Sequence, residues 1–430
     1  MIGIFLLVAG VYTMTLNSWN ANMFSLQNAT VASLVQKKSF ALYDQIIPGF
    51  NLVEGNETFR FGRQIYPMKQ PGQTILGAMI YTPLYLLGIN FENHFHYTSH
   101  LITLGTSTVM MAGAASLLFY LAYQISKKLF TSILVSLVFA FGTIIWPYGG
   151  VSHHDIYGVF WGLVAFTCYF EAREHRKTNY YWGAGFFASL SLFFTMLPLT
   201  FPLVLWGATL ISRRMLALKK ISLGMILGLL PTLSFNYLMF EKPWLPPNLA
   251  GKVADTMPLW SLPNFLDKLW FYLVSPTTSL LVFSPIIVFG IIGILKVPKT
   301  RLWLKQLLLL IPLFQLAHIS LMETFGGYQY GPRYLLTTLP YLSLGIVYWL
   351  KKEHDRFLGL IFGLAFTYSV GVAFLGAIRT VMYEVPGPYA PHVFLEQWLY
   401  SEGPDFRLFL PGLVLVIFSI FWFYKLKRAE

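Results

Sequence analysis

The chain has 430 residues, of which 56% are hydrophobic and only 11% are charged, and its mean hydropathy is +0.59. Soluble domains carry about a quarter charged residues, so this composition excludes a soluble protein and predicts a polytopic membrane protein. The net charge of +12 lies mostly in short clusters between apolar runs, as membrane orientation requires, and therefore does not indicate nucleic-acid binding. The single cysteine, Cys168, excludes a disulfide framework and a cysteine-based metal site.

Apolar runs of near-spanning length recur along the whole chain. They predict an all-α integral membrane protein with about twelve transmembrane helices, organised as a single domain over residues 1–430. The predicted spans are Ile2–Leu16, His100–Ile125, Leu129–Tyr148, Ile156–Phe170, Tyr181–Leu197, Thr200–Ile211, Ile221–Phe240, Ser279–Leu295, Leu302–Leu321, Leu335–Leu350, Phe357–Ala377 and Leu408–Tyr424. A further run, Thr74–Leu87, is ambiguous.

The basic clusters decide whether Thr74–Leu87 crosses the membrane. Lysine and arginine are enriched in cytoplasmic loops, and here they gather at Lys127/Lys128, Arg173/Arg176/Lys177, Arg213/Arg214, Lys219/Lys220, Lys296/Lys299/Arg301, Lys351/Lys352/Arg356 and Lys425/Lys427/Arg428. A spanning Thr74–Leu87 would place the long segment 17–72 on the side of Lys127 and Lys128. The run also follows Pro71-Gly72 and contains Pro83. We therefore predict an interfacial or re-entrant helix, both termini in the cytoplasm and all long loops outside.

The first predicted extracytoplasmic loop covers residues 17–99 and carries several polar candidates. After Asn20, a helical stretch runs to Lys38, and its apolar positions suit either a helix lying on the membrane or a simple surface helix. Asp44 follows this stretch. Tyr66 and Lys69 then precede the interfacial helix. Lys69 either snorkels to the lipid headgroups or binds a phosphate near the membrane surface.

A second polar group, His153-His154-Asp155, stands at a predicted helix start after Trp146-Pro147-Tyr148. These residues either cap the helix or bind a divalent metal through Asp155 or His154. Adjacent histidines on a helix point apart, so we do not expect both to bind one ion.

The strongest signal is a polar island, Met322–Tyr334, between two apolar runs. It contains Glu323, Tyr328, Tyr330 and Arg333, and such residues are costly near lipid, which indicates a functional site. Its glycines allow turns that bring the backbone close to a ligand. Arg333 opens the next span, where it either meets a lipid headgroup or binds a phosphate through two parallel hydrogen bonds.

These motifs together resemble those of the bacterial polytopic glycosyltransferases of the GT-C superfamily, which includes the protein O-mannosyltransferases and the lipid A aminoarabinose transferase. The motifs that carry the resemblance are Asn20 with the following helix, Tyr66–Gly72, Phe141-Gly142-Thr143 with Trp146–Tyr148, Ser284-Pro285 and Gly326–Tyr334. The resemblance implies many spans, two membrane-lying helices in the first outside loop, a polyprenyl-phosphate-linked sugar donor, and chemistry on the outer face of the cell membrane.

One departure from the family pattern concerns the catalytic base. These enzymes usually carry an acid at the start of the first loop, whereas the stretch Asn17–Asn22 contains none. The resemblance therefore implies that the catalytic base is Asp44 or Asp155. Glu54, Glu57 and Glu323 are further candidates. On the same reading, Lys69 and Arg333 hold the donor phosphate. The donor and acceptor pocket is expected to contain Asn20, Tyr66, His153, His154, Glu323, Tyr328 and Tyr330.

The sequence thus predicts a glycosyltransferase that moves a sugar from a polyprenyl-phosphate-linked donor to a glycan, lipid or protein acceptor. The pattern allows a divalent metal at Asp155 or His154 but does not require one. A transporter or flippase of a lipid-linked substrate is the alternative, and it predicts ionisable residues within the spans. The predicted span interiors carry almost no charge, which favours the enzyme. A catalytically inactive GT-C-like subunit is a third interpretation, because the usual loop acid is absent.

Overall fold

The structure is a computed structural model, and it describes residues 1–16, 22–42, 50, 57–247, 249–250, 262–322, 324–326, 330–351, 356–378 and 409–429. The first half of the chain contains α1 (Ile2–Met14), α2 (Asn22–Lys37), β1 (Thr58–Phe61), β2 (Gln64–Pro67), α3 (Pro71–Leu86), α4 (Phe91–Thr103), η1 (Leu104–Thr108), α5 (Val109–Ser126), α6 (Leu129–Phe141), α7 (Ile145–Gly149), α8 (Asp155–Glu174), α9 (Tyr180–Leu190), η2 (Ser191–Phe193) and α10 (Thr200–Ile211).

The second half contains α11 (Met215–Phe240), α13 (Phe265–Leu273), α14 (Leu280–Phe283), α15 (Ile287–Leu295), η3 (Lys299–Arg301), α16 (Leu302–Leu321), η4 (Arg333–Thr338), α17 (Leu339–Leu350), α18 (Arg356–Ile378) and α20 (Phe409–Ala429).

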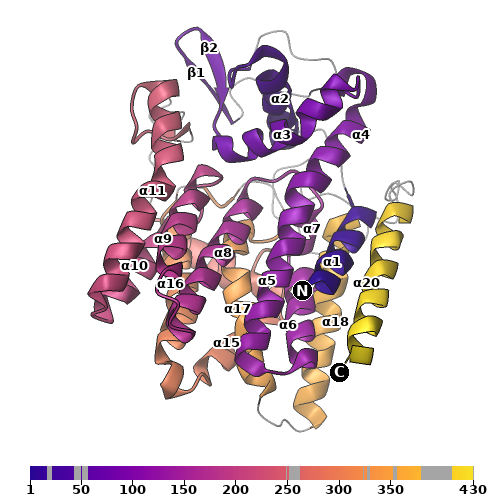
Figure 1. Ribbon diagram of the computed structural model, residues 1–430, viewed down its shortest axis with the longest axis vertical. Helices are drawn as coiled ribbons and strands as arrows, with labels where there is room; N and C mark the ends of the chain where they lie inside the picture. Colours follow the sequence, from indigo (N-terminus) through magenta and orange to yellow (C-terminus); the bar gives the residue numbers. More distant parts are fainter. Residues whose placement is uncertain are drawn as a thin grey trace.

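The molecule is a bundle of helices with a smaller cap at one end (Figure 1). The cap is formed by α2, α3 and the two-stranded sheet, and α3 runs across the end of the bundle rather than along it. Within the described residues, four helical segments are long and apolar enough to cross a membrane: Phe91–Ser126, Met215–Phe240, Lys299–Leu321 and Arg356–Ile378. Shorter apolar helices lie beside them. The all-α membrane architecture is therefore confirmed, whereas the span number of about twelve stays a prediction.

Several predicted spans are interrupted in the structure. Leu129–Tyr148 divides at Gly142 into α6 and α7, and Ser279–Leu295 divides at Ser284-Pro285 into α14 and α15. Proline lacks the amide hydrogen that a continuing helix needs, which explains the second break. The interruption after α6 matters for the site, because α7 and the loop behind it carry Tyr148 and the two histidines.

The predicted helix after Asn20 is confirmed as α2, but its apolar residues pack against protein. Ala29, Val31 and Ala32 are buried in one cluster with Tyr81 of α3 and Phe91 of α4. The described part of the cap thus uses this face as its own core.

The β1–β2 hairpin was not predicted from the sequence. The strands pair antiparallel from Thr58 with Pro67 to Phe61 with Gln64. Gly62 has a φ of +61°, a value that the primed turns of short hairpins require and that glycine adopts without steric cost. Phe59 and Tyr66 pack on Phe240 at the end of α11, so the hairpin is fixed to the bundle.

Candidate functional site

Five ionisable side chains from separate parts of the chain converge where the cap meets the bundle. Asp155 begins α8, His153 and His154 precede it, and Arg333 begins η4. Lys69 lies just after the hairpin. The charges of Lys69 and Arg333 both act on the Asp155 carboxyl and the His154 imidazole. The structure therefore brings the predicted phosphate-binding and metal-binding candidates into one site.

Asp155 holds the centre of this site. Its Oδ1 accepts a hydrogen bond from Thr195 Oγ1 at 3.1 Å and lies 3.2 Å from His154 Nε2. Its Oδ2 lies 3.4 Å from Arg333 Nη1. Both carboxylate oxygens are thus engaged, and the side chain is only 2% exposed. A buried carboxylate needs such partners, because leaving its charge unpaired would be strongly destabilising.

Arg333 is oriented by three further contacts. Its Nε donates to the carbonyl oxygen of Gly326, and its Nη1 lies 3.1 Å from His153 Nε2. The guanidinium carbon lies 4.9 Å from the centre of the Tyr334 ring. Gly326 has a φ of +104°, which a residue with a side chain rarely adopts. The turn in the polar island thus presents a carbonyl to Arg333 and fixes its planar group.

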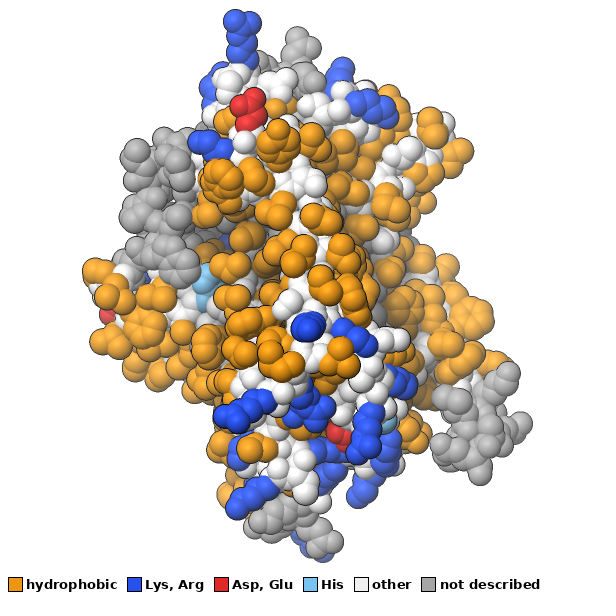
Figure 2. All heavy atoms as spheres, turned by 60° about the vertical axis from the view of Figure 1, so that its left-hand side comes forward, with side chains coloured by type: hydrophobic (Ala, Val, Ile, Leu, Met, Phe, Trp, Pro, Cys, Tyr) orange, Lys and Arg blue, Asp and Glu red, His pale blue; other side chains and the backbone are white. Residues whose placement is uncertain are grey.

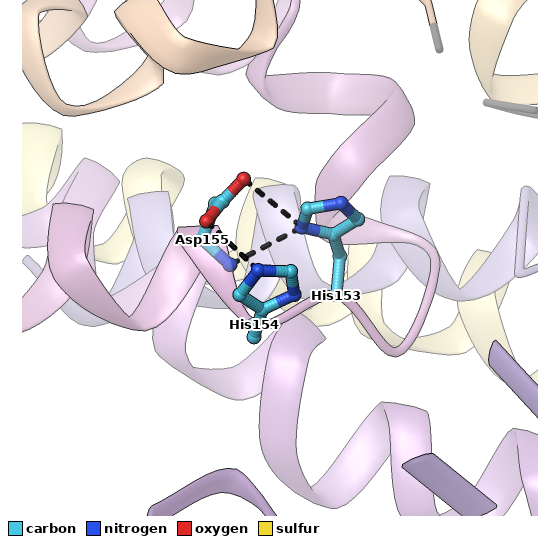
Figure 3. Close-up of side chains that lie close together, drawn as sticks. All are labelled: His153, His154 and Asp155. Carbon is cyan, nitrogen blue, oxygen red and sulfur yellow. Dashed lines mark hydrogen bonds and ion pairs between the residues drawn. The ribbon is translucent and has the colours of Figure 1, made fainter. Parts of the chain in front are cut away.

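The two histidine rings stack instead of pointing apart, as shown in Figure 3. Their centres are 4.8 Å apart and their planes differ by 14°. The expectation of divergence assumed that both lie on a helix, whereas both precede α8. Arg333 Nη1 faces His153 Nε2, and the backbone amide of Asp155 faces His153 Nδ1 at 3.2 Å. Both groups are donors, and a neutral imidazole accepts at only one of its two nitrogens, so it can accept only one of these two hydrogen bonds. His153 Nδ1 lies 3.8 Å from Asp155 Oδ2.

His154 connects Asp155 to the cap. Gln27 Nε2 lies 3.3 Å from His154 Nδ1, and because the amide nitrogen can only donate, Nδ1 accepts and Nε2 carries the hydrogen. Gln73 Nε2 donates to Gln27 Oε1 and to Ser152 Oγ, the latter at 2.8 Å. Burial, followed by the nearby positive charge of Lys69, lowers the pKa of His154 well below its ordinary value. The imidazole is therefore neutral at pH 7.

The hairpin places a carboxylate beside Lys69. The amide of Met68 donates to the carbonyl oxygen of Glu57 at 2.7 Å, which closes the base of the hairpin. Lys69 Nζ lies 2.9 Å from Glu57 Oε1. Burial alone would raise the pKa of the Glu57 carboxyl, but the positive charges of Lys69 and Arg333 outweigh it and hold the pKa below its ordinary value. Glu57 is therefore ionised at neutral pH.

The two described acids of the site differ in whether their carboxylate oxygens have hydrogen-bond partners. Glu57 is 31% exposed, and its Oε2 has no hydrogen-bond partner among the described residues. Asp155 is nearly inaccessible, with both oxygens engaged. Glu57 Oε2 is itself buried, so Glu57 is the described acid of the site with an unpartnered oxygen.

Other predicted site residues lie outside this group of contacts. Tyr66 is buried against Phe59 and Phe240, and its hydroxyl donates to Gln64 Oε1 at 2.8 Å. Tyr330 is fully buried, and its hydroxyl donates to the carbonyl oxygen of Val372. The carbonyl of Tyr330 accepts from Tyr148 at 2.8 Å, which packs the island against α7. Asn20, Asp44, Glu323 and Tyr328 lie outside the described residues.

Sequence reasoning missed the residues that hold the charged groups in place. Gln27 and Thr195 are far from residues 153–155 in the sequence, and no local pattern marks them. For Glu57 a signal did exist, because Thr-Phe-Arg-Phe and Gln-Ile-Tyr-Pro flank a glycine turn and predict a hairpin whose ends meet.

The site partly fits a divalent cation. The candidate ligand atoms of His153, His154 and Asp155 lie within 4.8 Å of one another. Two ligands of a tetrahedral zinc ion lie about 3.3 Å apart, and His154 Nε2 and Asp155 Oδ1 are 3.2 Å apart. Arg333 faces the remaining atoms, His153 Nε2 and Asp155 Oδ2, and its positive charge opposes a cation there. Among the described residues, His154 and Asp155 are therefore the pair suited to hold an ion, and binding would require His154 Nε2 to lose the hydrogen that the Gln27 contact assigns to it.

The helix bundle and its apolar helices define a multi-pass membrane protein. The chain is similar to the crystal structure of ArnT from Cupriavidus metallidurans in the apo state, with a TM-score of 0.56 and 12% sequence identity. The match covers 99% of this chain and 72% of ArnT. No protein-family model and no curated protein matches the chain. The likeness to an aminoarabinose transferase fold that the motifs predicted is confirmed, and at this identity it concerns the fold alone.

Proposed function

We propose that this protein is a glycosyltransferase that moves a sugar from a polyprenyl-phosphate-linked donor to an acceptor on the extracytoplasmic face of the membrane. The observation that carries the proposal is the convergence of Lys69 and Arg333 with two carboxylates at the end of an apolar bundle. The likeness to ArnT, an aminoarabinose transferase, supports a lipid-linked donor. The acceptor is a glycan, a lipid or a protein.

Lys69 and Arg333 bind the donor phosphate. Arg333 is held in a fixed plane, which suits paired hydrogen bonds to phosphate oxygens. Lys69 supplies a point charge, which Glu57 neutralises in the absence of donor. When the phosphate arrives, it competes with the Glu57 carboxylate for the same ammonium group. Positive charge placed on the departing phosphate stabilises the transition state more than the ground state.

Glu57 is the described carboxylate best suited to accept the acceptor's proton, with Asp44 as the second candidate. Once Lys69 contacts phosphate, Glu57 loses its nearest counter-charge, so its pKa rises and it becomes a better base. Asp155 positions Arg333 and His154 through its engaged oxygens. This assignment moves Asp155 from the base role expected from sequence to a positioning role.

The reaction balances without a further reactant. The acceptor oxygen attacks the anomeric carbon through an oxocarbenium-like state, and the bond from that carbon to the phosphate oxygen breaks. The acceptor proton passes to the carboxylate, and polyprenyl phosphate leaves as an anion bound to Lys69 and Arg333.

Orientation forms part of the proposal. The ends of α1 and α20 that carry the chain termini both point away from the cap (Figure 1). With the basic loops in the cytoplasm, both termini are cytoplasmic, the cap is extracytoplasmic, and the protein belongs to the cell membrane.

One experiment separates this function from transport of a lipid-linked substrate and from an inactive subunit. The full-length protein is reconstituted in liposomes with a polyprenyl-phosphate-linked sugar on one leaflet and a panel of acceptors. The enzyme is expected to release polyprenyl phosphate and glycosylate an acceptor. Movement of intact donor between leaflets without cleavage would support a flippase instead.

Removal of divalent cations is expected to leave transfer largely unchanged. Among the described residues only two side chains suit the ion, whereas structural zinc sites use four ligands, and Arg333 and Lys69 repel a cation. The measurement is the initial transfer rate before and after dialysis against a chelator, with metal content followed in parallel. A rate that falls on chelation and returns with added Zn²⁺ would show that the metal is required.

A further inference from the structure

A second pocket lies at the opposite end of the bundle from the site around Asp155. It has a volume of about 280 Å³ and is lined by Thr178, Tyr181, Arg214, Met215, Leu216 and Ala217. Helix α8 starts at Asp155 and ends at Glu174, so its 20 residues separate the two ends by roughly 30 Å. Lysine and arginine side chains gather at the lower end of the face drawn in Figure 2, below a largely apolar belt.

The pocket contains a buried polar group without a partner. Tyr181 is 2% exposed, and its hydroxyl has no hydrogen-bond partner among the described residues. Its ring packs on Tyr169 at 5.7 Å. A buried hydroxyl that makes no hydrogen bond costs free energy, so it calls for a polar ligand.

Positive charge lies at and near this pocket. Arg214 lines the pocket, and both Arg173 and Arg214 lie within electrostatic range of the Tyr169 hydroxyl. Arg173 Nη1 is buried and has no hydrogen-bond partner in the described part of the chain. Lys220 Nζ donates to Thr178 Oγ1 at 3.2 Å, which places a third cation at the pocket wall.

The nearby acids do not neutralise these cations. Glu171 pairs with Lys177 at 2.8 Å, and Glu174 pairs with Arg301. No acid in the described ranges lies within ion-pair distance of Arg173, Arg214 or Lys220. The pocket therefore has an excess of positive charge that an anion would balance.

The apolar part of the pocket indicates the kind of anion. Met215 and Leu216 line it and are exposed, and the adjacent Ile211 at the end of α10 is 77% exposed. A free anion gains nothing from such side chains, whereas an acyl chain would cover them. Basic pockets between helices on the cytoplasmic side bind acidic lipid headgroups.

We propose that this pocket binds the phosphate headgroup of an anionic phospholipid, with Arg214 and the Tyr181 hydroxyl as its polar contacts, Arg173 as a positive charge behind the pocket wall, and Met215 and Leu216 against an acyl chain. In the orientation proposed above, the lipid belongs to the cytoplasmic leaflet. The site is separate from the donor site.

The test is native mass spectrometry of the full-length protein titrated with phosphatidylglycerol, phosphatidylcholine or inorganic phosphate. Phosphatidylglycerol is expected to bind with clear preference over phosphatidylcholine. Each of Arg214→Gln and Arg173→Gln should weaken that binding about fivefold, since a basic residue at a membrane surface contributes about 1 kcal/mol. Tyr181→Phe should weaken the binding without lowering thermal stability, because it removes only an unpaired hydroxyl.

The matched control is Lys299→Gln, which removes one exposed charge at the same end of the bundle but outside the pocket. It should bind phosphatidylglycerol as the unmodified protein does. Equal binding of phosphatidylglycerol by all variants would overturn the proposal. Displacement of the lipid by millimolar inorganic phosphate would also overturn it, because the occupant would then be free phosphate.

Discussion

Replacement of Arg333 by alanine is expected to lower sugar transfer by about a hundredfold to a thousandfold, the usual effect of removing one group that stabilises transition-state charge. Arg333 is 5% exposed and is held in place by Asp155, His153 and the Gly326 carbonyl. The rate of polyprenyl phosphate release by purified protein is the readout. Undiminished turnover in this variant would refute the assignment of Arg333 to the donor phosphate.

Two controls separate this effect from misfolding. Removing Arg333 leaves the buried Asp155 carboxylate unpaired, which costs about 3–5 kcal/mol. The double variant Arg333→Gln with Asp155→Asn removes both charges, so it should regain thermal stability but not turnover. Arg63→Ala removes an exposed arginine of the hairpin turn and should leave the rate unchanged. Recovery of turnover in the double variant would mean that Arg333 serves only stability.

Replacement of Glu57 by glutamine is expected to lower kcat by about a hundredfold to ten-thousandfold, the range for loss of a general base. The KM for the donor should not rise, because the amide no longer competes with phosphate for Lys69. The unmodified enzyme should also lose activity as the pH falls through the Glu57 pKa, since only the carboxylate accepts a proton. That acidic decline should disappear in Glu57→Gln.

The comparison variant is Asp155→Asn, which we expect to raise the KM for the donor more than it lowers kcat, because Asp155 orients Arg333. A larger loss of kcat in Asp155→Asn than in Glu57→Gln would return the base role to Asp155. If both variants kept their kcat while Asp44→Asn lost it, the base would be Asp44.

Charge patterning and the family resemblance together predicted part of the group of residues that meets at the site. Basic clusters and apolar runs placed Lys69, Arg333 and the segment 153–155 beyond the same ends of their spans, and the structure brings them into one group. Their partners could not be predicted in this way. Thr195 and Gln27 contact the site through tertiary packing alone, and neither has a local sequence pattern.

Hydropathy predicted the helices better than their interruptions. Thr200–Ile211 and Leu302–Leu321 agree with α10 and α16. The mean hydropathy of a segment does not change much where one residue interrupts a helix. The ends of α6 and α14 were therefore not predicted, although Gly142 and Pro285 mark them. The stacking of His153 on His154 was also misjudged, because both were treated as helical residues at the helix start, whereas α8 begins only at Asp155.

The central claim is that Lys69 and Arg333 together bind the phosphate of a polyprenyl donor. The most direct measurement is the affinity of polyprenyl phosphate for the purified full-length protein and for Lys69→Ala, Arg333→Ala and the Arg63→Ala control. We expect both site variants to bind at least tenfold more weakly, a loss of about 1.4 kcal/mol each, and the control to bind normally. Equal affinity in all four proteins would contradict the claim.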